Sequence, residues 1–563
     1  MLLIGIAILY ISLVCWTWGF STLKLLKKIT QSDQTNTLSL SITSLVGLIV
    51  ISFIASLLSL FFPLGSINIQ LFLLTLTLLL LLQKKIVTNF RKQIAYIKLI
   101  NKGVILLFFL SMLLCMVMGS WEMNHPDTLA YHSQIILWIE KYKAVPGLVH
   151  LHSRFGLQSG WFVCNALFSF NFTGYGSYNY LNSTILAWYL YFIFSKINAC
   201  FFVQASPYKG FLWIAMLGLN LWSYTQVRLT ATSASPDFIA TICIWAVFYL
   251  IVTAAEQQNK GLHWVIVLLL ITFSLTIKLS AIPLALIYVY SIYRLATLQK
   301  FKLVVLAIIL SLIMVIPMAI RNIITSGYAL FPTTMGDFFN VDWKYDSNKT
   351  TVLENYVTAF ARTESASNES EIIRVNEMEL SQWVPTWWRY RSIADKSILL
   401  LLVVSIIFFL LSLRKIKKSS PDLKIALLTS MAGIVFWFVK APDPRFGFGF
   451  ILAFSALVSS YLTHSITESN NFRKIILLLL AGIGLSITSY ISYRFIHFFD
   501  NPQLIYPAGI KKNDFDAIIC EGVIFHIPKK ENDCGNIPLP CTYNACETFQ
   551  LRKKTVEEGF RAK

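Results

Sequence analysis

The chain contains few charged residues for its length. Only 13% of its 563 residues are Asp, Glu, Lys or Arg, whereas soluble domains carry about 25%. Hydrophobic residues make up 56% of the chain, and apolar runs of about 20 residues recur from end to end. The scarcity of charge excludes an ordinary soluble domain. A transmembrane barrel would show an alternation over segments of about ten residues, so we expect an all-α polytopic membrane protein.

Acidic residues are especially scarce, and two other signals are missing. The chain has 28 Asp and Glu against 47 Lys and Arg, a formal net charge of +19. In a membrane protein such an excess orients the helices through short basic loops, so membrane lipids rather than nucleic acid are the expected partners. There is no Walker A glycine loop, which argues against ATP hydrolysis. An obvious internal repeat of the kind found in two-half transporters is also missing.

The apolar runs predict about 14 membrane helices. We place them at residues 2–20, 39–63, 67–83, 103–119, 180–203, 208–227, 237–255, 262–279, 281–297, 303–320, 397–413, 423–440, 446–463 and 474–492. The first run has no basic segment before it and is expected to be a membrane helix rather than a cleaved signal peptide. Residues 161–172 are apolar but too short to span, and we expect a re-entrant or interfacial piece.

Basic residues alternate between the loops. The loops that should lie inside are basic and poor in acids, for example the loop with Lys84, Lys85, Arg91, Lys92, Lys98 and Lys102. Lysine and arginine mark the inner side of a membrane. The pattern therefore predicts that the N-terminus, the loop 120–160, the segment 321–396 and the tail after residue 492 lie outside.

Four of the nine cysteines lie together in the polar tail, and the other five lie in or beside apolar runs. The tail cysteines are Cys520, Cys534, Cys541 and Cys546. Their spacing contains no CxxC, which disfavours a zinc site. An outer, oxidising location favours two disulfides, although the pairing is left open.

The outer loop 120–160 carries a polar segment with a candidate catalytic carboxylate. Pro126 suits a helix start, and apolar residues follow at three- and four-residue spacing, which predicts an amphipathic helix lying in the membrane interface. Asp127 in its first turn is either a helix cap or a general base held at the membrane surface. His125 and His132 would orient it, bind phosphate or simply sit in the interface.

Other charged residues also fall at the ends of apolar runs on the predicted outer side. Asp237 follows a proline at a helix start and is either a cap or a second acid. Lys278 lies between two apolar runs, where a lysine costs about 2.5–3.5 kcal/mol at the bilayer centre unless it snorkels. We expect it to line an outer cavity. Arg321 and Arg445 lie on the side where the orientation rule does not account for positive charge. Arginine binds phosphate oxygens in a bidentate manner, so these residues suggest a site for a lipid-linked phosphosugar.

Several segments resemble those of a known group of membrane enzymes. The quoted stretches are "HPDTLAYH", "WIEKYKAVPGLVHLHSRFGLQSGWF", "APDPRFG", "CGNIPLPC" and "LRKKTVEEGF". They resemble an uncharacterised bacterial family of glycosyltransferase-like membrane proteins, and the wider pattern is similar to the GT-C superfamily of integral membrane glycosyltransferases. The resemblance covers most of the chain from about residue 104 onward.

The resemblance implies a GT-C-like fold and a periplasmic site in the bacterial inner membrane. It implies a polyprenyl-phosphate sugar donor, an envelope glycan, lipid or protein acceptor, and inversion at the sugar. Asp127 would be the base, with Asp237 as a second acid, while Lys278 and Arg445 would face the phosphate. The chain departs from the pattern because Asp127 has no paired acid beside it, three helices precede the module, and the C-terminal part is short. A divalent metal held by His125, Asp127, His132 and Asp237 is left open, and no other cofactor is expected.

We divide the chain into five parts. These are an N-terminal three-helix segment at 1–102, a catalytic membrane module at 103–320, a periplasmic loop at 321–396, further membrane helices at 397–492 and a small periplasmic tail at 493–563. A polysaccharide polymerase or ligase, which would depend on outer arginines more than on Asp127, is an alternative. A flippase of lipid-linked glycans is a second alternative, but the largely apolar centres of the helices disfavour it.

Overall fold

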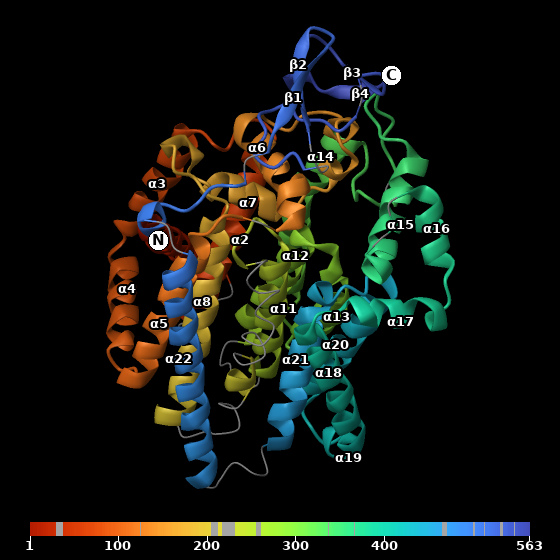
Figure 1. The fold of residues 1–563 in the computed structure, drawn as a ribbon. Coiled ribbons are helices and arrows are strands. Elements are labelled where there is room, and N and C mark those ends of the chain that lie inside the picture. Colours follow the sequence, from red (N-terminus) through yellow and green to blue (C-terminus); the bar gives the residue numbers. More distant parts are fainter. Residues whose placement is uncertain are drawn as a thin grey trace.

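The protein is described by a computed structural model that is mostly helical and ends in two small antiparallel sheets (Figure 1). It describes residues 1–29, 38–123, 125–203, 212–216, 231–254, 260–335, 337–364, 366, 368–463, 470–498, 501–511, 513–529, 533–544 and 546–563.

The described helices of residues 1–326 run from α1 to α14. They are α1 (Leu2–Ile29), α2 (Leu40–Leu58), α3 (Ile67–Leu81), α4 (Lys84–Ile97), α5 (Lys102–Gly119), α6 (Ser133–Lys141), α7 (Gly160–Phe168), α8 (Asn179–Asn198), α11 (Asp237–Val252), α12 (Lys260–Ile277), α13 (Ala285–Thr297) and α14 (Phe301–Ser326). Short π-helices precede α6 at Thr128–His132 and extend α8 at Ala199–Val203, and a 3-10 helix at Leu279–Leu284 leads into α13.

The described part of the second half contains eight helices, followed by the C-terminal sheets. The helices are α15 (Ser347–Thr363), α16 (Glu369–Glu377), α17 (Leu380–Tyr390), α18 (Ile393–Leu411), α19 (Leu413–Ile416), α20 (Pro421–Lys440), α21 (Pro444–Thr463) and α22 (Asn470–Phe498). Strands β1 (Phe515–Cys520) and β2 (Val523–Pro528) form one antiparallel hairpin, and β3 (Phe549–Leu551) and β4 (Phe560–Ala562) form the other.

Nine helices of the described chain are long and apolar enough to cross a membrane, or up to ten if the bent pair α3 and α4 is one span. The nine are α1, α2, α5, α8 with its π-helical extension, α13 with the preceding 3-10 helix, α14, α18, α20 and α22. The chain is therefore a helical membrane protein, as expected. Its orientation stays a prediction.

The other expected spans are accounted for individually. Residues 67–83 belong to α3, which turns by 88° into α4. Three more segments form the shorter apolar helices α11, α12 and α21. α11 has 16 residues and reaches about 24 Å, less than the ~30 Å of a bilayer core. Residues 208–227 lie mostly outside the described residues. The count of about 14 spans thus stays a prediction.

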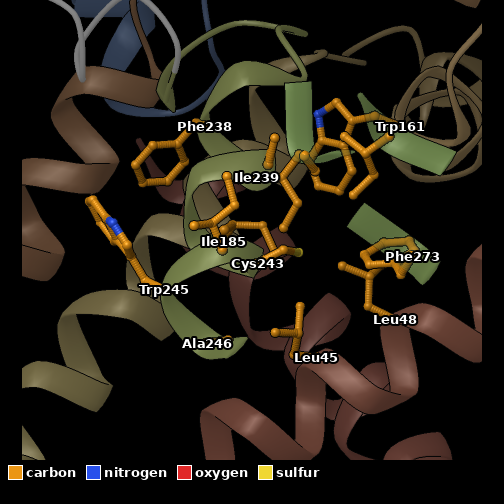
Figure 2. Packing of buried hydrophobic residues seen from close by; sticks show 14 of the residues in the cluster. Leu45, Leu48, Trp161, Ile185, Phe238, Ile239, Cys243, Trp245, Ala246 and Phe273 are labelled. Carbon is orange, nitrogen blue, oxygen red and sulfur yellow. The ribbon is translucent and has the colours of Figure 1, made fainter. Parts of the chain in front are cut away.

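α11 is buried along most of its length and packs against α8, α12, α20 and α21. Trp245 of α11 also donates a hydrogen bond from its indole Nε1 to the carbonyl of Gly449 in α21 at 2.9 Å. Asp237 is the first residue of this buried helix. Figure 2 shows the surrounding side chains, among them Leu45 and Leu48 of α2, Trp161 of α7, Ile185 of α8, Ile239 and Cys243 of α11, and Phe273 of α12.

Residues 501–563, here called the C-terminal region, cover the end of the bundle near α6 (Figure 1). Two disulfides join Cys520 to Cys546 and Cys534 to Cys541. The expected disulfides are thus present, and the zinc alternative is excluded because all four thiols are bonded in pairs. The tail is a small β structure rather than a continuation of the all-α fold. Its start lies beside the N-terminus, since Leu3 donates its backbone N–H to Ile505 at 2.9 Å.

Candidate functional site

Asp127 and Arg445 form an ion pair at the end of the bundle that the C-terminal region covers. Nη1 of Arg445 lies 2.8 Å from Oδ2 of Asp127, and its Nε lies 3.1 Å from Oδ2 of Asp443. Asp443 also accepts the backbone N–H of Arg445 at 3.1 Å. Pro444 begins α21 between them, as its fixed φ favours. One guanidinium therefore joins the loop before α6 to the start of α21.

A second ion pair lies beside the first. Lys278 donates from its ammonium group to the carboxylate of Asp237. Lys278 lies between the end of α12 and the 3-10 helix, and its backbone there is extended. The Phe446 ring contacts both cations, with Nζ of Lys278 3.7 Å and Cζ of Arg445 4.7 Å from its centroid. We call Asp127, Asp237, Lys278, Asp443 and Arg445 the charged cluster.

The charged cluster is sheltered but still accessible. The side chain of Asp237 is 7% exposed, Arg445 16%, Lys278 23% and Asp127 26%. Burial alone would raise the pKa of Asp127, but the positive charge of Arg445 holds the pKa well below its usual range. Asp127 is therefore ionised in this state and is a weak base while the ion pair lasts.

The two histidines flank Asp127 and are neutral. Nε2 of His125 lies 3.5 Å from Nη1 of Arg445, and Nδ1 of His132 lies 3.2 Å from the hydroxyl of Thr128. Burial lowers the pKa of His125, and it lowers the pKa of His132 to about 3. Neutral imidazoles add no positive charge for a phosphate. Their geometry instead suits holding Arg445 and the first turn of the helix in place.

The predicted interfacial helix is in fact buried on both faces, which corrects the sequence interpretation. Ile135, Trp138 and Ile139 pack inward as the spacing requires, but Gln134 on the polar side is also fully buried. Gln134 donates from Nε2 to the carbonyl of Ile537 in the C-terminal region at 2.8 Å. The polar face thus packs against a segment distant in sequence and does not face lipid headgroups. Within the segment at 161–172, the residues of α7 are all buried, whereas Asn171 and Phe172 are exposed, and its predicted re-entrant or interfacial position stays a prediction.

Arg321 does not belong to the charged cluster, contrary to the expectation from its position at a helix end. Its side chain is 1% exposed within α14. Nε donates to Oε1 of Gln158 at 2.8 Å, and Nη1 donates to the hydroxyl and carbonyl oxygens of Ser59 at 3.0 and 3.3 Å. Its charge is therefore used inside the protein to join α14 to the end of α2.

The metal alternative finds no matching geometry. Among the described residues, no group of three or more His, Cys, Asp or Glu side chains is placed to hold a metal ion. The carboxylates of the expected set are directed elsewhere, since Asp127 pairs with Arg445 and Asp237 pairs with Lys278.

Three residues of interest were missed by the sequence analysis. Asp443 lies within the quoted stretch "APDPRFG" and completes the partners of Arg445. Arg154 contributes to lowering the pKa of Asp127 and donates to the hydroxyl of Tyr356 at 2.9 Å. Glu140, in the same loop, is buried and accepts hydrogen bonds from two neutral groups. The side-chain amide of Asn171 donates to both of its carboxylate oxygens at 2.8 Å, and the hydroxyl of Tyr178 donates at 3.4 Å. The sequence around each of these residues gives no signal, because single acidic residues and arginines are common in the loops of any protein.

A separate apolar cavity of about 70 Å³ lies between α2, α8, α11 and α21. Its walls are aromatic and aliphatic, and Trp188, Trp213 and Trp245 are among them. No described residue of the charged cluster lines it. The cavity begins at Ile242, five positions after Asp237 along α11, or about 7.5 Å at the helical rise.

Comparison with known proteins gives a family but no activity. A family model described as "Domain of unknown function (DUF8201)" matches residues 1–452. The chain belongs to this family. No curated protein and no solved structure matches it. The region of the DUF8201 match contains the whole charged cluster, whereas the C-terminal region lies beyond it.

Proposed function

We propose that this DUF8201 protein is a GT-C-type membrane glycosyltransferase. It would transfer a sugar from a polyprenyl-phosphate donor to an envelope glycan, lipid or protein on the periplasmic face of the bacterial inner membrane. One observation carries the proposal: two carboxylate–cation pairs from four distant segments meet around Phe446 at the end of the apolar helices. Such a site combines a base with cations that suit a lipid phosphate.

Lys278 and Arg445 would hold the donor phosphate. Both are partly exposed, and each is paired with a carboxylate. A phosphate would exchange with these carboxylates as the partner of the cations, and arginine can bind two of its oxygens at once. The apolar cavity along α11 offers space for part of a long lipid chain on the same helix that carries Asp237.

Asp127 would then act as the general base. A hydroxyl oxygen of the acceptor attacks the anomeric carbon of the sugar and its proton passes to Asp127. The bond from the anomeric carbon to the phosphate oxygen breaks, and the polyprenyl phosphate leaves with its charge compensated by Lys278 and Arg445. A single displacement inverts the configuration of the anomeric carbon. Drawing Arg445 toward the phosphate also removes the main group that lowers the pKa of Asp127, so that burial raises its basicity as the donor binds.

The test uses the full chain in liposomes with a panel of polyprenyl-phosphate sugars labelled in the sugar. Membrane and periplasmic fractions from a strain lacking the gene supply the acceptor. We expect transfer from at least one donor, and a fall of about 10²-fold or more in rate for Asp127→Asn. Polyprenyl monophosphate binding should be kept in that variant and lost in Lys278→Met.

Asp342→Asn is the matched control, because Asp342 is also ion-paired through its carboxylate, to Arg552, outside the charged cluster. Full transfer by a folded Asp127→Asn protein would overturn the proposal. If Arg445→Ala abolished activity while Asp127→Asn kept it, a polymerase or ligase that depends on arginine would be the better assignment.

A further inference from the structure

The C-terminal region contacts the chain on both sides of Asp127. Before Asp127, Ser120 accepts the backbone N–H of Ala508 at 2.8 Å, and Met123 forms a parallel bridge with Ile510. After Asp127, the carbonyl of Leu129 accepts the backbone N–H of Gly535 at 2.7 Å. The carboxylate is therefore carried by a short segment whose two ends are bonded to a distant part of the chain.

The contacts after Asp127 fall on the π-helix that follows it. A π-helix shifts hydrogen bonds to five-residue spacing and leaves carbonyls without the usual partner. Here the C-terminal region satisfies two of them, because Leu129 accepts from Gly535 and Ala130 accepts from the hydroxyl of Tyr543 at 3.1 Å. The conformation next to Asp127 thus depends on donors from outside the helix.

Side chains at the start of α6 hold the same loop in return. The hydroxyl of Ser133 donates to the carbonyl of Gly535 at 2.8 Å. Gln134 donates to the carbonyls of Gly535 and Ile537 at 3.3 and 2.8 Å. Gly535 has a positive φ of 45°, which glycine adopts without strain. One tight turn therefore donates to the π-helix and accepts from α6.

This turn is closed by one of the two disulfides. Cys534 and Cys541 are bonded across a separation of seven residues, and both are fully buried. Ile537 between them is 1% exposed. The second disulfide, Cys520 to Cys546, begins at the end of β1 and joins no residue of this turn.

We propose that the disulfide-closed loop Cys534–Cys541 positions Asp127 for reaction by fixing the π-helix that follows it. The role as reacting carboxylate rests on the proposed function, whereas the fixing of the segment does not. A closed loop keeps its donors and acceptors in place before the substrate arrives, so the carboxylate is ordered in advance. Lys278 and Arg445 lie on other segments, and the loop would not alter how they hold a phosphate.

Hydrogen exchange of the full chain in nanodiscs tests the positioning directly. The double variant C534S/C541S should exchange the amides of residues 128–134 about tenfold or more faster than the wild type, because hydrogen bonds from outside the helix are released. The matched variant C520S/C546S, which opens the other disulfide, should leave these amides unchanged. Equal exchange in the two double variants overturns the proposal.

A second pair of variants keeps both disulfides intact. Gln134→Ala removes two contacts to the loop, and Asn544→Ala is its control, because Asn544 joins the C-terminal region to His150 instead. We expect faster exchange at 128–134 for Gln134→Ala alone. No change in that variant, with C534S/C541S failing to fold, also overturns the proposal.

Transfer assays separate this inference from the proposed function. Opening the loop should lower kcat about tenfold with little change in the donor KM, since only the base is displaced. A raised donor KM with normal kcat would overturn positioning of Asp127. If the exchange results are as expected but no polyprenyl-phosphate sugar is consumed by the wild type, the loop fixes this segment and the proposed function is wrong.

Discussion

Arg445 and Asp127 are 318 positions apart in the chain, yet Nη1 of the arginine lies 2.8 Å from Oδ2 of the aspartate. The same guanidinium reaches Asp443 through Nε at 3.1 Å. Through this two-sided contact, Arg445 joins the loop before α6 to the start of α21. It also sets the ionisation of the carboxylate that we propose as the base.

Arg445→Lys should shift the pH dependence of transfer. Lysine keeps the positive charge but cannot bridge Asp127 and Asp443, so less of the charge faces Asp127. Arg445 lowers the pKa of Asp127 against the effect of burial, and a weaker partner lets that pKa rise. The acidic limb of kcat/KM should therefore move to higher pH, and the donor KM should rise about tenfold.

The control for this shift is Arg552→Lys, which alters the bidentate pair with Asp342 outside the charged cluster. Its pH profile should match that of the wild type. An acidic limb that stays in place for Arg445→Lys would show that Asp127 is not the group observed in the profile.

The pair of Lys278 and Asp237 should show strong coupling in a double-mutant cycle. Lys278→Met leaves the buried carboxylate of Asp237 unpaired, and removal of one partner of a buried pair costs about 3–5 kcal/mol. Asp237→Asn in the Lys278→Met background removes that charge and should restore much of the free energy of unfolding. The free energies of unfolding of the four proteins of the cycle are compared by thermal unfolding in detergent.

The exposed pair of Lys553 and Glu558 in the C-terminal region is the control cycle, and it should show much weaker coupling. Additive effects for Lys278 and Asp237 would mean that the ion pair is not maintained in the protein.

Arg321→Met should destabilise the protein without changing donor binding. The guanidinium donates to Gln158 and to both oxygens of Ser59 within the core. Losing these bonds should lower the free energy of unfolding by about 3 kcal/mol, as for hydrogen bonds to charged groups. Binding of polyprenyl monophosphate, measured on folded protein, should equal that of the wild type, in contrast to Arg445→Met. A loss of binding in both variants would return Arg321 to the phosphate site.

Glu140 should make the stability depend on pH near neutrality. Burial raises the pKa of Glu140 to about 7, although hydrogen bonds from Ser169, Asn171 and Tyr178 favour its charged form. The folded state then binds more protons than the unfolded state between the ordinary value of 4.5 and about 7. The stabilisation is therefore complete below the unfolded pKa and is lost as the pH rises through the folded one, by about 3 kcal/mol in total.

Glu140→Gln cannot ionise and should lose this dependence. Its melting temperature should change little from pH 5 to 8, and at pH 8 it should exceed that of the wild type. Glu122→Gln is the control, since Glu122 is an exposed acid in the same outer loop. A wild-type melting temperature that is constant over this range would contradict the raised pKa.

Local sequence patterns predicted much of the framework of the site. Pro126, Pro236 and Pro444 stand at or next to helix starts, as the fixed φ of proline favours, and each lies beside a charged residue of the charged cluster. The same kind of pattern led to a wrong prediction for Arg321, which also lies near a helix end but does not belong to the charged cluster. The difference lies in the neighbours, because Ser59 and Gln158 enclose Arg321 whereas Asp127 reaches Arg445. Such neighbours come from segments far away in the chain.

The amino-acid sequence by itself determined that this is a helical membrane protein with a disulfide-bonded tail, because apolar runs and cysteine placement are local properties. It also named four of the five residues of the charged cluster, leaving out Asp443. Only the tertiary structure decided which carboxylate meets which cation, that α6 is covered by the C-terminal region, and that Gly535 bonds to the π-helix that follows Asp127. These contacts depend on packing between segments that are hundreds of residues apart. The periodicity of a single sequence reports only local structure and does not indicate which distant segments meet.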